Sequence, residues 1–446
     1  MVSDVLKNCP YPKCDHVAGL GDQRYCPDCK GTVWRCAGCG STNQVFATYC
    51  RGCGRPLTQG ADSWTHHARC SMRDSYQSLC AVKEGPGAAS VALIREADFS
   101  CEDDVEAGLL IAYGMVYVTT ASGRVIALDK EDLALQKTWA APADAGYHST
   151  PVIQGHSLFL AGSRILTRFR LRGSIDPQVI HELPEGWQFG RHSLVACEDY
   201  LAATCFGEGG RSWKVLVFRP GDSERFELGW ESEPFVDCQG LLMPLIVSSQ
   251  KVLVLITGTG GVYQFRPLEL SPCIAANAHS SPSGFCPSIH PAAQGNYVFL
   301  IAGSPPHASL VSIYLATPSL TTNLVRSLEG FFPHGLTLAA NFVLVSLADG
   351  FSLLSGNHPI CLQDHPKELL QDAAVALGQY TVFSSATCGL LHPYRFSCGG
   401  VDRLDPYPRD ESPSGHPYVS VVPGSSEIIA VRRDGVVHRL AFKAGG

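Results

Sequence analysis

Short apolar runs alternate with turn-forming residues along most of this chain. Beyond residue 100, runs rich in valine, leucine, isoleucine and aromatic residues are separated by clusters of glycine, serine, aspartate and proline. No long segment has apolar residues at the 3.6-residue spacing of an amphipathic helix. Short apolar runs bounded by turn residues are typical of β-strands. We therefore expect residues 88–446 to form a mainly β domain.

One strand–turn–strand unit recurs along this domain. Its clearest copy is GMVYVTTASGRVIALD, from Gly114 to Asp129, in which a glycine turn joins two apolar runs. Further copies begin near His156, Tyr200, Lys251, Tyr297, Phe342, Tyr380 and Ile428. Four of the turn glycines are Gly123, Gly261, Gly350 and Gly435. Their separations correspond to three, two and two repeats of about 43 to 46 residues, a length found in repeat architectures.

Repeats of this length predict a β-propeller. Units of about 40 to 50 residues with four strands each are its sequence signature, and every blade packs against its neighbours. Apolar runs at Ser149, His192, Gly335 and Tyr418 would form innermost strands, and LQKTWAA at Leu135 an outermost strand. The hairpins favour eight blades over seven, and a pair of β-sandwiches is the alternative fold.

The last predicted hairpin, at Ile428, is not followed by an outermost strand before Gly446. The segment AASVALIREA, Ala88 to Ala97, can supply that strand from the other end of the domain. Pairing there would cover a sheet edge that otherwise promotes aggregation. We therefore expect Ala88–Ala97 to close the propeller.

The segment VYVTTASGRVIALDKEDLALQKTW, residues 116–139, resembles the repeat of pyrroloquinoline-quinone-type propellers. The resemblance covers one blade well and the others in outline. WD-repeat propellers are also similar, although no consistent Trp-Asp pair ends the blades. The vicinal disulfide, calcium-binding carboxylates and secretory signal of catalytic family members are not recognisable in this sequence. The resemblance therefore implies the propeller architecture without quinone chemistry.

Eight of the nineteen cysteines form four pairs near the N-terminus. The pairs are Cys9 with Cys14, Cys26 with Cys29, Cys36 with Cys39, and Cys50 with Cys53. Tetrahedral zinc needs four donors and a CxxC turn offers two thiolates, so two pairs make one site. Pairing in chain order predicts two zinc ribbons with two zinc ions over residues 1–57. The first pair has two extra residues between its cysteines, so His16 is an alternative donor to Cys9.

A disulfide cluster is the alternative to these zinc sites. The first residues lack the apolar segment of a secretory signal. In a reducing compartment such cysteine pairs are held as metal ligands. This favours zinc binding in the cytoplasm over disulfide formation.

The segment CAGCGSTNQVFATYCRGCGRPL, from Cys36 to Leu57, resembles the double zinc ribbon family. Gly40 and Gly54 each follow the second cysteine of a pair, where a glycine permits the turn around the metal. The resemblance implies an interaction or adaptor module, and it brings no catalytic residue. We interpret residues 58–87 as a linker, in part helical, between the ribbons and the propeller at 88–446.

Composition and charge narrow the range of functions that the chain could have. Charged residues make up 17% and apolar residues 45% of the chain, which favours a large buried core and excludes extensive disorder. Residues 1–60 carry seven Lys or Arg against four Asp or Glu, and the remainder carries 27 against 37. This acidic excess disfavours nucleic-acid binding through bulk electrostatics. The most apolar stretch, Leu241–Thr257, contains polar residues that argue against a membrane-spanning helix.

Two groups of residues are candidates for recognition. Histidines precede predicted innermost strands at His148, His192, His334 and His416. They could bind an anion or a metal, respond to pH, or only make local hydrogen bonds in turns. Loops rich in aromatic and arginine residues, Trp187–Arg191 and Phe331–His334, are candidate binding hot spots because these residue types dominate interface energetics.

We expect a non-catalytic cytoplasmic adaptor or scaffold whose zinc ribbons and propeller bind other proteins. Two alternatives remain. The ribbons could bind nucleic acid through Arg24, Lys30, Arg35, Arg51 and Arg55. The propeller channel could serve an enzyme or a sensor of a small ligand, although the sequence has no P-loop, nucleotide-binding glycine fingerprint or nucleophile elbow.

Overall fold

A computed structural model divides the chain into two compact units, Met1–Ser63 and Trp64–Gly446. It describes residues 28, 33–35, 41–44, 76–77, 91–105, 108–142, 149–171, 176–197, 199–210, 212–220, 226–236, 245–247, 252–257, 261–265, 275–278, 289–294, 297–303, 306–315, 320–329, 332–339, 342–347, 350–355, 358–362, 370–377, 380–385, 389–397, 400–408, 415–423 and 427–444. In the first unit, β1 (Val33–Arg35) and β2 (Thr42–Gln44) form an antiparallel pair.

The second unit consists of antiparallel sheets with four main strands each. The first sheet contains β5 (Leu110–Ala112), β6 (Met115–Thr119), β7 (Arg124–Asp129) and β8 (Leu135–Ala140). The second contains β9 (Val152–Gln154), β10 (Ser157–Ala161), β11 (Ile165–Arg170) and β12 (Gln178–Glu182). The third contains β13 (Gln188–Ala196), β14 (Leu201–Phe206), β15 (Ser212–Pro220) and β16 (Phe226–Glu231), with β17 (Phe235–Val236) also paired to β15. A 3₁₀ turn, η2 (Glu208–Gly210), joins β14 to β15.

The same arrangement continues along the chain. The fourth sheet contains β18 (Leu245–Val247), β19 (Val252–Ile256), β20 (Gly261–Phe265) and β21 (Ala275–Ala278). The fifth contains β22 (Ala292–Gln294), β23 (Tyr297–Ala302), β24 (His307–Leu315) and β25 (Leu320–Glu329). The sixth contains β26 (Pro333–Ala339), β27 (Phe342–Leu347), β28 (Gly350–Ser355) and β29 (His358–Leu362). The seventh contains β30 (Leu370–Leu377), β31 (Tyr380–Ser385), β32 (Leu391–Ser397) and β33 (Gly400–Arg403).

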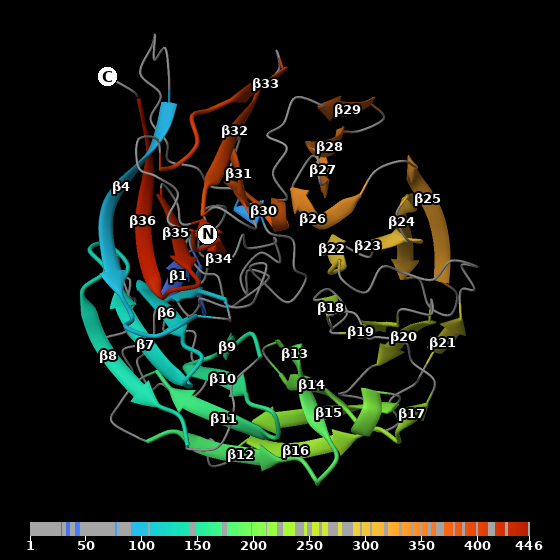
Figure 1. Ribbon diagram of the computed structural model, residues 1–446. Helices are drawn as coiled ribbons and strands as arrows, with labels where there is room; N and C mark the ends of the chain where they lie inside the picture. The colour runs from blue at the N-terminus through green and yellow to red at the C-terminus, as the bar shows by residue number, and fades with distance from the viewer. Residues whose placement is uncertain are drawn as a thin grey trace. The chain divides into compact units, whose positions relative to one another are not determined.

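The closing sheet contains β34 (Tyr418–Pro423), β35 (Glu427–Arg432), β36 (Val436–Ala444) and β4 (Val91–Ser100). Within the second unit the sheets follow one another around a common centre, with the first strand of each sheet innermost (Figure 1). The innermost strands contact one another in order from β5 through β9, β13, β18, β22, β26 and β30 to β34. Four-stranded antiparallel sheets packed radially are a β-propeller. The predicted mainly β fold with a propeller is therefore confirmed.

The middle strands of each sheet explain the apolar runs in the sequence. In β6, residues Val116–Thr119 are buried in succession, whereas β8 is mostly exposed. Both faces of a middle strand are covered because each sheet packs between two neighbours, so its apolar residues run continuously instead of alternating. All the predicted hairpins form the second and third strands of a sheet. The fully buried Trp213 and Phe265, for example, pack in one cluster between the third and fourth sheets.

The predicted closing strand is confirmed, with slightly different bounds. Val91–Ser100, rather than Ala88–Ala97, pairs antiparallel with β36, from Val436 opposite Ser100 to Ala444 opposite Val91. Glu96 adds ion pairs to Arg439 at 2.6 Å and to Lys443 at 2.7 Å. Strands from the two ends of the second unit thus complete one sheet.

The closing sheet is also joined to the first sheet. Backbone N–H groups of Cys101 and Val105 donate to the carbonyls of Gly435 and Arg433, at 3.0 Å and 2.8 Å. At the other end of the strands, Lys130 Nζ lies 3.0 Å from Glu427 Oε1, and both side chains are more than 90% buried. Gly435 has φ of 79°, and an added Cβ would lie 2.2 Å from the Asp103 carbonyl oxygen. This turn therefore requires glycine.

The helix expected within the linker is corrected at two residues. Tyr76 and Gln77 form β3, which pairs in parallel with Ala376 and Leu377 of β30. They are a strand instead of part of the helix that we expected, because the inner edge of β30 offers backbone hydrogen-bonding groups. The rest of 58–87 lies outside the described residues. Within the described part of the chain, no helix has the length and apolar character needed to cross a membrane.

Candidate functional site

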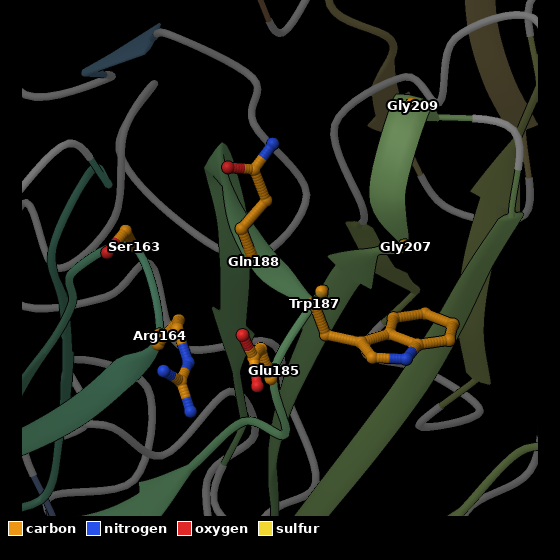
Figure 2. Close-up of a pocket in the computed structure, with 8 residues that line it drawn as sticks. Ser163, Arg164, Glu185, Trp187, Gln188, Gly207 and Gly209 are labelled. Atoms are coloured by element: carbon orange, nitrogen blue, oxygen red, sulfur yellow. The ribbon is translucent and has the colours of Figure 1, made fainter.

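Loops from the second and third sheets line an open cavity of about 450 Å³. Its lining comes from the β10–β11 turn, the β12–β13 loop and the β14–β15 turn, and includes Ser163, Arg164, Glu185, Trp187, Gln188, Gly207 and Gly209. In an antiparallel four-stranded meander these three connections leave the sheets at the same edge. Figure 2 shows Arg164 and Glu185 on one side of the cavity, while the Trp187 indole extends away from them.

Arg164 is held in place by the neighbouring loop. Its Nε and Nη2 atoms donate to the Leu183 carbonyl at 3.1 Å and 2.9 Å, and Nη2 lies 3.4 Å from Glu182 Oε1. Backbone N–H groups of Leu183 and Phe189 donate to the carbonyls of Arg164 and Ser163, both at 2.8 Å. The Arg164 side chain is nevertheless 44% exposed. It therefore presents a positive charge to solvent from a fixed position.

Trp187 is fixed from two sides. Lys214 Nζ lies 4.5 Å from the centre of the indole, and it also forms an ion pair with Glu231. On another side, an added Cβ at Gly207 would lie 3.6 Å from Trp187 Cζ2 and 2.3 Å from Ser212 Oγ. The missing side chain at Gly207 thus makes room for the tight turn beside the indole. The Trp187 side chain remains partly exposed, and the residues that line the cavity present apolar as well as polar surface to it.

The charges around the cavity are of both signs. Glu185 and Gln188 are exposed and line the same cavity as Arg164. Behind the rim, burial lowers the pKa of His181, and the positive charge of Lys214 acts in the same direction. Because its pKa lies below the ordinary 6.5, His181 is neutral at pH 7. A rim with one Arg, one Glu, an amide and an indole suits a polar ligand of low net charge.

The structure brings one of the two predicted hot-spot loops to this cavity. Trp187 and Gln188 line it, whereas the Arg191 side chain lies outside the described part. In the second loop, Phe332 is 52% exposed and Pro333 is buried at the start of β26. Sequence reasoning missed Arg164, which follows the turn of a neighbouring repeat. The repeat spacing could have indicated it, since equivalent turns gather on one face.

The four predicted histidines differ in their positions and in whether the structure describes their side chains. His192 lies on β13 and contacts the ring of His290, which the sequence analysis did not select. His416 is exposed. His334 is on β26, with its side chain outside the description, and His148 is not among the described residues. His290 precedes β22 as the predicted histidines precede other innermost strands, but the sequence did not mark the three-residue β22 as such a strand.

The predicted zinc ligands lie outside the described residues. These are Cys9, Cys14, Cys26, Cys29, Cys36, Cys39, Cys50 and Cys53. The zinc ribbons therefore stay a prediction, although β1 and β2 stand on either side of Cys36 and Cys39 in the chain. Within the described ranges, no three or more His, Cys, Asp or Glu side chains gather in a way that could hold a metal ion.

Two cysteines of the second unit are buried apolar groups. Cys101 and Cys205 are 3% and 0% exposed. Burial raises the pKa of each thiol to about 12. Both are therefore neutral thiols and poor nucleophiles at physiological pH.

No family model and no curated protein matches the chain. Among solved structures, BamB from Moraxella catarrhalis is 13% identical with a TM-score of 0.58, covering 80% of this chain and 99% of that one. The computationally designed Ika8 protein is 12% identical with a TM-score of 0.58, covering 78% and 99%. Quinohemoprotein alcohol dehydrogenase from Comamonas testosteroni is 10% identical with a TM-score of 0.56, covering 85% and 80%.

These similarities concern the fold alone. The likeness to these structures supports the β-propeller architecture that the sequence indicated. At identities of 10% to 13%, neither an activity nor a ligand carries over to this chain. Function must be argued from its own residues.

Proposed function

We propose that this protein is a non-catalytic adaptor whose propeller binds a protein partner at the loops around the Trp187 cavity. The observation that carries the proposal is that Trp187 and Arg164 are partly exposed yet fixed by Lys214 and by the Leu183 carbonyl. Trp and Arg are the residue types that contribute most to protein interfaces. Side chains that are already ordered lose less entropy when a partner binds.

The rim supports a polar peptide segment as the part of the partner that enters the cavity. Arg164 can donate to a carbonyl or carboxylate, and Glu185 can accept from an N–H group or pair with a cation. The Gln188 amide can both donate and accept hydrogen bonds, and the indole of Trp187 offers apolar contact area. This mixture matches an extended peptide better than a polyanion such as nucleic acid.

The N-terminal cysteines would form the second docking element, as a double zinc ribbon with two zinc ions. The antiparallel pair β1–β2 around Cys36 and Cys39 supports a knuckle at this position. We expect two zinc ions per chain in the purified full-length protein and about one after Cys36→Ser with Cys39→Ser. Disulfide-linked cysteines under non-reducing mass spectrometry, or unchanged zinc in the double variant, would contradict the ribbon.

We further propose that each four-stranded sheet is one blade, giving eight blades with β4 completing the last. The cytoplasm is the proposed location, because the buried Cys101 and Cys205 remain thiols. Free thiols persist in reducing compartments, where structural disulfides are rare.

A matched pair of glutamines tests the docking face. A photo-crosslinking amino acid replaces Gln188 at the cavity rim or Gln178 on the exposed part of β12, each in the full-length chain. We expect a discrete protein adduct from position 188 and none, or a much weaker one, from position 178. Equal adducts at both positions, no protein adduct, or an adduct with nucleic acid would contradict the proposal.

A further inference from the structure

One end of the Arg164 guanidinium is available to a ligand. Its Nε and Nη2 atoms donate to the Leu183 carbonyl, so one edge of the planar group is bound to the protein. Within the described part of the chain, none of the hydrogen bonds of Arg164 uses Nη1. Nη1 and the outer N–H of Nη2 are spaced to donate to the two oxygens of one carboxylate. The side chain is 44% exposed, so a carboxylate can reach this end from solvent.

The negative charges beside Arg164 limit the ligand to a single carboxylate. Glu182 Oε1 is 3.4 Å from Arg164 Nη2, at the long end of hydrogen-bond distances, and the Glu182 side chain is 61% exposed. This ion pair is therefore weak, and a better-placed carboxylate can replace Glu182 at the guanidinium. Glu185 adds a second negative charge to the cavity lining. Both glutamates repel a strongly acidic segment, whereas Arg164 offsets the charge of one carboxylate.

The Trp187 indole supplies an apolar surface in the same cavity. Lys214 Nζ, 4.5 Å from the centre of the indole, supports it on one side. On another part of the lining, Gly209 has φ of 74°, and no atom lies within 4 Å of the position that its Cβ would take. The cavity thus combines a cation, an indole and open space beside a glycine-rich turn. A ligand that carries a carboxylate and an apolar side chain close together would use both surfaces.

The last residue of a polypeptide has this form. Its α-carboxylate is attached to the same carbon as its side chain, so no side-chain torsion has to be fixed to place the charge. An internal Asp or Glu loses the freedom of its own torsions when its carboxylate is held by Arg164. The backbone N–H of the last residue can donate to the Glu185 carboxylate, which also lines the cavity. These features favour a chain end over an acidic side chain within a chain.

We propose that the Trp187 cavity binds the C-terminal residue of a partner protein, with the α-carboxylate on Arg164 and an apolar side chain against Trp187. This inference rests on the proposed docking function and adds which part of the partner enters the cavity. Capture of a C-terminal carboxylate is a recurring mode of peptide recognition. The partner is thus defined by its chemistry, as a chain that ends in an apolar residue with few acidic residues before it.

The crosslink from position 188 tests which part of the partner enters. After photo-crosslinking in the full-length chain, peptide mass spectrometry identifies the partner peptide that is attached at this position. We expect the peptide that contains the partner's C-terminus. A peptide from the interior of the partner's sequence would overturn the C-terminal assignment and leave the docking function standing. Absence of any protein adduct would remove both.

A synthetic copy of the attached peptide tests the role of the carboxylate. It is made with a free C-terminal carboxylate and, separately, with a C-terminal amide, and fluorescence anisotropy measures the binding of each to the wild-type full-length protein. We expect the acid to bind at least about 10-fold more tightly than the amide, because the amide cannot form charge-assisted hydrogen bonds with Arg164. This comparison needs no variant of the protein. Equal affinities of the acid and the amide would refute the proposal.

Variants around the guanidinium assign the preference to Arg164. R164Q should bind the acid and the amide equally. R433Q, which removes an exposed arginine between β35 and β36, should prefer the acid as the wild type does. E182Q should bind the acid a few-fold more tightly, because Arg164 loses its competing carboxylate. A preference for the acid that persists in R164Q, or that is lost equally in R433Q, would contradict this assignment.

Discussion

Two places where neighbouring sheets meet show opposite uses of polar residues. The closing seam, between the closing sheet and the first sheet, buries the ion pair of Lys130 and Glu427. The cavity seam, between the second and third sheets, holds Lys214 beside Trp187 and leaves a cavity of about 450 Å³. The closing seam uses charge to join strands distant in sequence. At the cavity seam the Arg164 side chain is 44% exposed, where a partner can reach it.

Breaking β4 should have the largest effect on the closing seam. Leu93 is 6% exposed on this strand, and its neighbour Ile94 is 40% exposed. Leu93→Asp places an unpaired charge in the core and should lower the free energy of unfolding by about 4 kcal/mol or more. Ile94→Asp, the matched control, should cost less than about 1 kcal/mol. Urea unfolding measures both, and equal losses would show that β4 is not firmly docked.

Breaking the buried ion pair should have the next largest effect on the free energy of unfolding. Lys130→Met leaves Glu427 as an uncompensated buried charge and should cost about 3 to 5 kcal/mol. Adding Glu427→Leu removes that charge and should restore most of the loss. A double-mutant cycle in denaturant measures the coupling. Additive losses would mean that the two side chains do not interact in solution.

The closing sheet should also make stability depend on pH. His438 is 5% exposed, and its Nδ1 atom is 2.9 Å from the Tyr418 hydroxyl. Burial lowers the pKa of His438 from 6.5 to about 4. The neutral ring therefore contributes stability above pH 6.5 that is lost as the pH falls toward 4, up to about 3 kcal/mol.

Urea midpoints measured between pH 7 and pH 4 test this dependence. His438→Gln should remove most of the decrease in that window, although it lowers stability at pH 7. His307→Gln, at an exposed position, should keep the decrease in stability between pH 7 and pH 4. Asp434 contributes little there because its pKa is lowered from 3.8, so its loss begins at lower pH. An unchanged slope in His438→Gln would refute the assignment.

The smallest effect on stability is expected at the cavity seam. Lys214→Met repeats the substitution made at Lys130, but Glu231 is 40% exposed and keeps its hydration. Loss of the ion pair and of the contact with Trp187 should cost about 1 kcal/mol. Crosslinking from position 188 should nevertheless decrease, since Trp187 loses a support. A loss as large as that of Lys130→Met would erase the difference between the seams.

The propeller could be predicted from the sequence because the two middle strands of each sheet are apolar runs joined by a glycine-containing turn. Val116–Thr119 and the glycine turn before Arg124 recur in outline in every hairpin. The closing strand was also predictable, since the last hairpin lacked a fourth strand. These features are local or follow from counting repeats.

The candidate sites were harder to predict because they combine loops from different repeats. Arg164 and Glu185 line one cavity only after two loops fold toward each other, and His192 contacts the ring of His290 from a different sheet. The three-residue β22 has no distinctive pattern, so the histidine before it was overlooked. Tyr76 and Gln77 become a strand only because β30 is beside them.

The pairing of β4 with β36 also fixes the order of events during biosynthesis. Glu96 and Arg439 are 343 residues apart in the chain. At about 5 to 20 residues per second, β4 leaves the ribosome on the order of tens of seconds before β36 does. During that time its apolar residues have no permanent partner, so a chaperone or neighbouring nascent sheets must shield them. Ring closure is therefore a late step in folding, and nascent chains stalled before β36 should be especially prone to aggregate.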